Sequence, residues 1–88
     1  MLYRICTEDM NQKGIESILN RHYEGYSILK SQGYWKLQKE NSLIIEIITK
    51  DNEGKEDNTI REIAEEIKEA NKQDAVLVQV FNNNQWFI

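Results

Sequence analysis

The sequence predicts a single small α+β domain over residues 1–88, with a four-stranded antiparallel sheet and two helices on one of its faces. Two kinds of periodicity support this prediction. Four segments alternate between apolar and polar residues or are rich in β-branched ones, which is typical of strands. Two other segments repeat apolar residues every three or four positions, which is typical of amphipathic helices.

The N-terminal part of the chain predicts one strand followed by one helix. Residues 2–7 alternate between the two faces of an extended segment, as a strand does. Residues 15–23 carry apolar side chains at three- and four-residue spacing, which predicts one stripe of an amphipathic helix. Gly25 follows directly and favours the left-handed conformation that ends many helices, so we expect the helix to stop there.

The middle of the chain predicts an antiparallel hairpin. Residues 26–38 form an extended segment in which Gly33 marks a bulge or a bend. Residues 39–42 are polar and predict the turn. Residues 43–50 are apolar on both faces except at Glu46, which is expected of a central strand.

The C-terminal part predicts the second helix and the last strands. Thr59 and Glu62 have the spacing of a capping box, and the apolar stripe over residues 60–70 predicts the helix that follows. Residues 75–81 predict the fourth strand. Residues 85–88 are candidates for a short fifth strand after an Asn-rich turn.

The order of these elements is strand, helix, strand, strand, helix, strand. In this arrangement both crossovers are right-handed, and both helices lie on the same face of the sheet. The pattern resembles the ferredoxin-like plait across nearly the whole chain. Because that fold carries many unrelated functions, the resemblance implies an architecture and no activity.

Composition excludes several classes of protein. No apolar run approaches the roughly 18–20 residues that cross a bilayer, and no signal peptide is visible. Cys6 is the only cysteine, which excludes an internal disulfide and a cysteine zinc site. The net charge of −4 argues against general nucleic-acid binding, which needs clustered Lys and Arg. We therefore expect a cytoplasmic protein that needs no metal or cofactor and binds no membrane.

The alternation of the strands predicts which residues face the helices and which lie on the opposite face. The predicted helix-facing residues are Tyr3, Ile5, Leu43, Ile45, Ile47, Val76, Val78 and Val80. The opposite face then holds Leu2, Arg4, Cys6, Ile44, Glu46, Ile48, Leu77, Gln79 and Phe81. Arg4, Glu46 and Gln79 fall on three adjacent strands, so we expect a cross-strand row of a cation, an anion and an amide.

This opposite face is too apolar to be left in water, so something is expected to cover it. The candidates are a second copy in a homodimer or higher homo-oligomer, the tail over residues 84–88, a ligand or a foreign protein. The predicted interface residues are Arg4, Ile44, Glu46, Leu77, Gln79 and Phe81. RNA-binding plaits carry stacking aromatic rings on this face, and the first and third strands here carry none.

The most specific local feature is the segment Gly33-Tyr34-Trp35-Lys36, with Lys39 close by. Aromatic rings beside ammonium groups hold planar anionic molecules such as nucleotides, because bases stack on rings. The candidate ligand-binding residues are Tyr34, Trp35, Lys36, Lys39 and Trp86. The alternative is that Trp35 packs under the hairpin and the lysines keep the protein soluble.

No catalytic constellation is visible. His22 is the only histidine, and no serine or cysteine is tied to it by a recognisable spacing. Cys6 lies on a predicted strand and is best interpreted as a small buried apolar residue. We therefore predict a protein that is not an enzyme.

Residue usage adds a resemblance. Twelve Ile, nine Asn and eight Lys against three Arg are typical of an AT-rich genome. The small acidic domain resembles proteins of phages and mobile elements of low-GC bacteria, many of which block a host defence complex or sequester its nucleotide messenger. Taken together, the apolar sheet face, the aromatic and basic hairpin and this resemblance lead us to expect a self-associating protein that binds a small anionic ligand, such as a nucleotide, in counter-defence.

The alternative is an inhibitor or adaptor of the anti-CRISPR kind that binds a protein. It would dock through its apolar sheet face or through its acidic second helix, since residues 51–74 hold nine acidic and four basic side chains.

Overall fold

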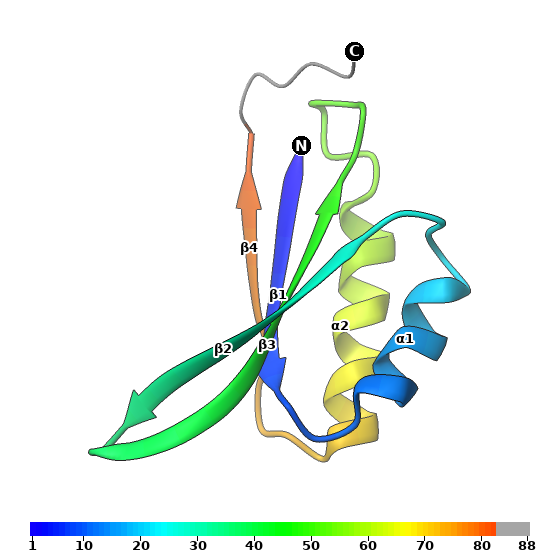
Figure 1. The fold of residues 1–88 in the computed structure, drawn as a ribbon. Helices are drawn as coiled ribbons and strands as arrows, with labels where there is room; N and C mark the ends of the chain where they lie inside the picture. The colour runs from blue at the N-terminus through cyan, green and yellow to red at the C-terminus, as the bar shows by residue number, and fades with distance from the viewer. Residues whose placement is uncertain (83–88) are drawn as a thin grey trace.

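The computed structural model describes residues 1–82, with the side chain of Trp35 outside the described part. Its elements are β1 (Leu2–Glu8), α1 (Gln12–Asn20), β2 (Ser27–Trp35), β3 (Gln38–Ile48), α2 (Asp57–Asn71) and β4 (Leu77–Phe81). This order confirms the predicted α+β, ferredoxin-like arrangement (Figure 1). The predicted fifth strand over residues 85–88 lies outside the described residues.

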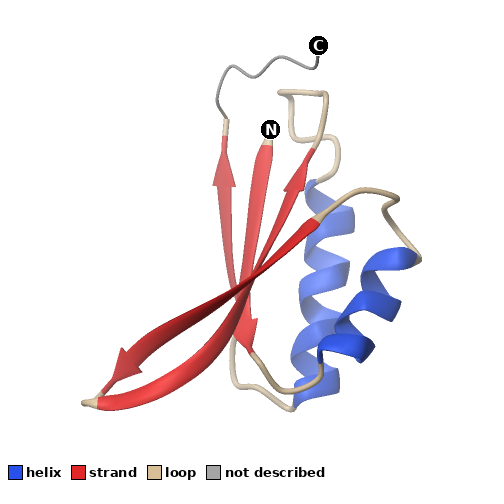
Figure 2. Ribbon diagram, viewed as in Figure 1, coloured by secondary structure: helices blue, strands red, loops and turns tan. Residues whose placement is uncertain are grey.

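The four strands form one antiparallel sheet in the order β2-β3-β1-β4. Both helices cover the same face of this sheet (Figure 2). The register places Ile5 of β1 opposite Ile45 of β3 on one side and opposite Val78 of β4 on the other. Ile5, Ile45 and Val78 therefore lie in one row and face the helices together, as the sequence predicts.

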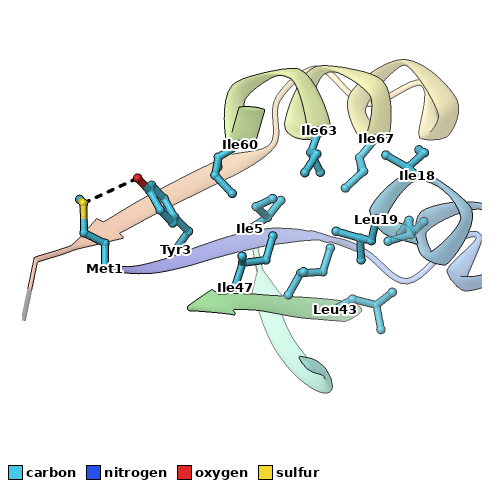
Figure 3. Packing of buried hydrophobic residues seen from close by; sticks show 12 residues of the cluster. Met1, Tyr3, Ile5, Ile18, Leu19, Leu43, Ile47, Ile60, Ile63 and Ile67 are labelled. Atoms are coloured by element: carbon cyan, nitrogen blue, oxygen red, sulfur yellow. Dashed lines mark hydrogen bonds between the residues drawn. The ribbon is translucent and has the colours of Figure 1, made fainter. Parts of the chain in front are cut away.

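The core lies between the helices and the sheet. On β1, Tyr3 and Ile5 are fully buried while the alternate residues Arg4 and Cys6 are only half-buried, so the two-residue period of the strand separates the two faces. Figure 3 shows the side chains of β1 and β3 meeting those of the helices. The fully enclosed aliphatic residues are Ile5, Ile15, Leu19, Leu43, Ile45, Ile47, Ile60, Ile63 and Ile67.

Helix α1 is shorter than predicted. It begins after Asn11, whose side-chain oxygen accepts a hydrogen bond from the backbone N–H of Gly14 at 3.1 Å. It ends at Asn20 with Arg21 in the right-handed conformation, and Gly25 is not left-handed. The apolar stripe misled the prediction because Tyr23 continues it in the following turn, where its N–H still bonds to the Leu19 carbonyl at 2.9 Å.

Helix α2 begins at Asp57, two residues before the predicted capping box, and Glu56 stands at its N-cap without a side-chain hydrogen bond. It ends at Asn71, and the C-cap Lys72 adopts the left-handed conformation with φ of 53°. The Lys72 N–H then bonds to the Glu69 carbonyl at 3.2 Å, which closes the helix.

The hairpin turn lies at Lys36 and Leu37, not at residues 39–42 as predicted. Both turn residues have positive φ, of 51° and 65°, which is the conformation that two-residue hairpin loops require. Asn and Gly usually fill these positions, so Lys-Leu carries no turn signal. Residues 39–42 belong to β3 and are polar because the β2–β3 hairpin projects beyond the helices (Figure 1).

This turn predicts a stabilising substitution. Replacing Lys36-Leu37 by Asn-Gly should raise the free energy of unfolding by about 0.5–1.5 kcal/mol, because both residues then tolerate positive φ. Urea denaturation measures the change. Lys39→Asn is the control, since Lys39 lies in an extended strand and should gain nothing. An unchanged or lower midpoint for the double variant would contradict the assigned turn.

Candidate functional site

A cleft lies between α2 and β4, on the helix side of the sheet. Its volume is about 640 Å³, within the range usual for small-molecule sites. One wall comes from α2, the other from β4 and the residues before it, and Tyr3 of β1 also lines it. The lining residues are Tyr3, Asp57, Ile60, Arg61, Ala64, Glu65, Lys68, Ala75, Val76, Val78 and Val80.

Helix α2 presents a stripe of charges to this cleft. Asp57, Arg61 and Glu65 recur every four residues and Lys68 follows after three, so all four lie on one helix face. Ile60 and Ala64 line the cleft beside them, and the small Ala64 side chain leaves room. The cleft therefore combines two anions and two cations with an apolar wall.

Tyr3 is anchored at the N-terminal end of α2. Its hydroxyl donates a hydrogen bond to Asp57 Oδ1 at 2.5 Å, while Met1 Sδ lies 3.7 Å away as a weaker acceptor (Figure 3). A phenol has one proton to donate, and a carboxylate accepts it better than a thioether does. We therefore expect the Tyr3 proton to be directed to Asp57.

Electrostatics keeps this phenol protonated. Burial raises the pKa of Tyr3 above its usual range, and the hydrogen bond and negative charge of Asp57 raise it further. At neutral pH the pair is therefore a neutral phenol bonded to a carboxylate. Such a carboxylate is held in one place and can accept hydrogen bonds from hydroxyl or amino groups of a ligand in the cleft.

The loop before α2 orders the residues that lead to Asp57. Asp51 Oδ2 accepts hydrogen bonds from the backbone N–H groups of Lys55 at 3.0 Å and Glu53 at 3.2 Å. The Lys55 N–H is the main reason that the pKa of Asp51 lies below its usual range. Gly54 has a φ of 77°, and a Cβ there would meet Asp57 Oδ2 at 2.8 Å, so glycine makes room for the carboxylate.

Sequence reasoning did not single out this cleft. It placed Tyr3 correctly on the helix-facing side, and it considered the charges of residues 51–74 only as a surface for docking a protein. One signal was present: Tyr3 is the only phenol among otherwise aliphatic helix-facing positions of its strand and its neighbours, and a buried phenol needs a hydrogen-bond acceptor.

The predicted ligand-binding residues lie elsewhere, at the tip of the β2–β3 hairpin. Tyr34 is 72% exposed and stands opposite Lys39, with Lys36 in the turn. The backbone of Trp35 pairs with Gln38. Trp86 lies outside the described residues. The structure brings Tyr34 and Lys39 together as the hypothesis requires, and ligand binding there stays a prediction.

The predicted interface residues share the face opposite the helices. Arg4 stands opposite Glu46 on one side and Gln79 on the other, which is the predicted row. Its Nε lies 2.7 Å from Glu46 Oε2, and its guanidinium lies 5.1 Å from the centre of the Phe81 ring. Ile44 and Leu77 both pair with Cys6 in the next row along the sheet. Their role in an interface stays a prediction.

His22 lies beside an ion pair that joins the turn after α1 to α2. Its Nε2 lies 3.3 Å from Glu66 Oε2, and Arg21 Nη2 lies 2.9 Å from Glu66 Oε1.

Within residues 1–82 no group of His, Cys, Asp and Glu is arranged to hold a metal ion. The helices of that same part are too short or too polar to span a bilayer.

Comparison with known proteins finds similarity in structure. No protein-family model matches the chain, and no curated protein matches it significantly. A phage SAM lyase in the apo state has a TM-score of 0.68 and 24% identity over 88% of this chain and 75% of the lyase chain. A phage SAM lyase in complex with S-methyl-5′-thioadenosine has a TM-score of 0.67 and 23% identity, over 88% and 76% of the two chains.

These findings correct one prediction. The similar structures are lyases, and lyases are enzymes, so the prediction of a non-enzymatic protein is contradicted. It rested on the lack of a nucleophile beside a base, which is only one way to build an active site. The predicted resemblance to phage proteins is supported at the level of the fold.

The buried phenols predict a loss of stability at high pH. In the unfolded chain tyrosine ionises near 10.0, whereas burial and the Glu56 carboxylate raise the pKa of Tyr23 to about 12, and that of Tyr3 is raised as well. The unfolded state therefore loses its protons first, so stability is full below pH 10 and falls as the pH rises toward 12. Each phenol contributes a slope of up to about 1.4 kcal/mol per pH unit.

Urea denaturation between pH 8 and 12 tests this prediction. Tyr3→Phe should reduce the slope, while Tyr34→Phe, on the exposed hairpin, should retain it. Equal slopes for the wild type and Tyr3→Phe would contradict the protonated state assigned to the Tyr3–Asp57 pair.

Proposed function

We propose that this chain binds S-adenosylmethionine (SAM) in the α2–β4 cleft and cleaves it to S-methyl-5′-thioadenosine. The observation that carries the proposal is the cleft itself, in which a fixed Tyr3–Asp57 pair stands beside charges of both signs and an apolar wall. The likeness of the whole fold to phage SAM lyases, one of them in complex with S-methyl-5′-thioadenosine, supports the choice of ligand.

The chemistry of the cleft matches the parts of this ligand. SAM carries an adenine ring, a ribose diol, a sulfonium, an ammonium and a carboxylate. Val76 and Val78 offer an apolar surface to a flat base, and Arg61 and Lys68 offer cations to the carboxylate. Asp57 and Glu65 offer acceptors to the diol or the ammonium and a negative potential to the sulfonium.

The reaction needs little from the protein because the substrate carries its own leaving group. Forming S-methyl-5′-thioadenosine breaks the bond between sulfur and the aminocarboxypropyl carbon. The electron pair of that bond moves to sulfur, and the cation becomes a neutral thioether without accepting a proton. The carbon left behind can be attacked by the substrate's own carboxylate, which closes a lactone, or it can form an alkene when a base removes a neighbouring proton.

The protein's role is then to orient the substrate. The carboxylate and the carbon that it attacks belong to one molecule, so the protein raises the rate by holding them in the geometry in which they react. Arg61 or Lys68 would supply that hold. This account uses no nucleophilic serine or cysteine and is consistent with the lack of one beside His22.

Incubation of the purified protein with SAM tests the proposal. We expect S-methyl-5′-thioadenosine to accumulate, as measured by liquid chromatography and mass spectrometry, together with homoserine lactone or the corresponding alkene amino acid. We also expect S-methyl-5′-thioadenosine to raise the melting temperature. Absence of both cleavage and a thermal shift would overturn the proposal.

Asp57→Asn tests the site. Loss of a charge-assisted hydrogen bond costs about 1.5–3 kcal/mol, so kcat/KM for SAM should fall about 10- to 150-fold. Glu53→Gln is the matched control, because Glu53 is an exposed carboxylate of the neighbouring loop that does not line the cleft.

Lys39→Ala tests the alternative that SAM binds at the tip of the β2–β3 hairpin. A loss of SAM binding in Lys39→Ala, with Asp57→Asn unaffected, would move the site from the cleft to the hairpin.

A further inference from the structure

The β2–β3 hairpin extends past the part of the sheet that the helices cover (Figure 1). Leu43 is the first buried residue of β3, and residues 38–41 before it are all exposed. We call residues 30–42, which form this extension, the hairpin arm. Because the arm covers no part of the core, its side chains contribute little to the packing of the domain and are free to contact another molecule.

One face of the arm is basic. The register places Tyr34 opposite Lys39, and Lys30 lies on the same face of β2, four residues before Tyr34. Glu40, the only acidic residue of the arm, pairs with Gly33 and therefore belongs to the other face. No lysine of the arm takes part in an ion pair within the described residues. Their charges are therefore available to an anionic partner.

The arm differs in charge from the rest of the chain. Residues 30–42 hold three lysines and one glutamate, a net charge of +2, in a chain whose net charge is −4, so the remaining residues carry −6. About 13 Å of strand separates Lys39 from Leu43, which exceeds the Debye length of roughly 8 Å at physiological ionic strength. An anionic partner can thus approach the end of the arm without strong repulsion from the acidic remainder.

The turn at the end of the arm holds exposed side chains on a strained backbone. Lys36 and Leu37 both have positive φ, which residues other than Gly, Asn and Asp adopt at a cost. The Leu37 side chain is 98% exposed, so packing within the domain does not offset this cost. Tyr34, beside the turn, is 72% exposed. Backbone strain without an internal benefit points to a function of these side chains outside the domain.

Lysines around an aliphatic tip favour a lipid surface over other anionic partners. A nucleic-acid strand would bind the lysines and stack a base on Tyr34, but it offers Leu37 no apolar environment. A small anionic molecule needs a concave site, whereas the side chains of this turn stand in solvent. At a membrane surface, lysines meet anionic headgroups, a tyrosine ring lies at the interface and a leucine reaches the acyl chains.

We propose that the tip of the hairpin arm docks on an anionic lipid surface. Leu37 enters the boundary between headgroups and acyl chains, while Tyr34, Lys36 and Lys39 lie at the level of the headgroups. The sequence argues against a segment that spans a bilayer, and a peripheral contact of this kind needs none. The contact leaves the α2–β4 cleft free, because no residue of the arm lines it.

Solubility is the competing explanation for the lysines. Lysines on an edge strand oppose edge-to-edge aggregation, and β2 is an edge strand. That role gives no reason for an exposed leucine at the turn. The contribution of Leu37 to binding therefore separates the two explanations.

The binding is expected to be weak and dependent on charge. Each lysine at an anionic surface raises the partition coefficient about fivefold, so the three lysines together raise it about a hundredfold. Burial of one leucine side chain adds a factor of about ten to a hundred. Binding should therefore be measurable at millimolar lipid and should weaken with salt.

Vesicle cosedimentation tests the proposal. The probe is a vesicle of phosphatidylcholine with about 30% phosphatidylserine, compared with a vesicle of phosphatidylcholine alone. The wild-type chain should bind the anionic vesicles at least about tenfold more strongly, and salt at about 0.5 M should remove most of this difference. Equal binding to the two kinds of vesicle, or binding to neither, would overturn the proposal.

Lys36→Asn combined with Leu37→Gly is the decisive variant. Both substitutions favour the positive φ of the turn, so the domain should be at least as stable as the wild type. Its partition coefficient on anionic vesicles should nevertheless fall at least about fiftyfold, because one lysine and the leucine are lost. A loss of binding in this variant cannot come from unfolding, which urea denaturation checks.

Met10→Ser combined with Lys13→Asn is the matched control. It also removes one lysine and one exposed apolar side chain, since Met10 is 59% exposed in the loop after β1 and Lys13 is exposed on α1. Its binding should stay within about twofold of the wild type, because neither residue belongs to the arm. If the control loses as much binding as the turn variant, or the turn variant binds like the wild type, the tip is not the docking site.

A labelled single-stranded oligonucleotide, followed by fluorescence anisotropy, tests the nucleic-acid alternative. Binding of the oligonucleotide without binding of anionic vesicles would assign the tip to nucleic acid and overturn the proposal. Vesicle binding without oligonucleotide binding is the expected result. All these measurements are made without SAM, so their outcome is independent of whether the cleft cleaves it.

Discussion

The pairing register of β1 is the constraint on which the rest of the structure depends. This strand lies in the middle of the sheet and pairs with β3 and with β4. Its alternation directs Tyr3 and Ile5 into the core and Arg4 and Cys6 to the opposite face. A slip of one residue would exchange these two sets, so the aliphatic core, the Tyr3–Asp57 contact and the Arg4–Glu46 pair all require the same register.

This constraint gives the two faces of the sheet different physical tasks. The helix side carries the cleft, where a phenol that is protonated at neutral pH bonds to a carboxylate at the first residue of α2. The other side has no helix, and its charged pair is embedded in exposed aliphatic carbon.

The sequence predicted the order of elements, the inward and outward faces of the strands, and the row of Arg4, Glu46 and Gln79, because each follows from local periodicity. It failed where tertiary structure overrides local preference. The turn formed at Lys36-Leu37 although neither residue favours positive φ, since the register of the long hairpin leaves those two residues unpaired. The cleft was missed because its members lie 54 residues apart, as Tyr3 and Asp57 do, and only packing brings them together.

One wall of the cleft is also an edge strand of the sheet. β4 is five residues long, lies at the edge and is hydrogen-bonded to β1 alone, and α2 leaves Val80 half exposed. Short edge elements of this kind detach at a lower free energy than the molecule needs to unfold globally. Detachment of β4 would widen the cleft, so amide deuteration of Leu77–Phe81 would slow when a bound molecule bridges that strand to α2.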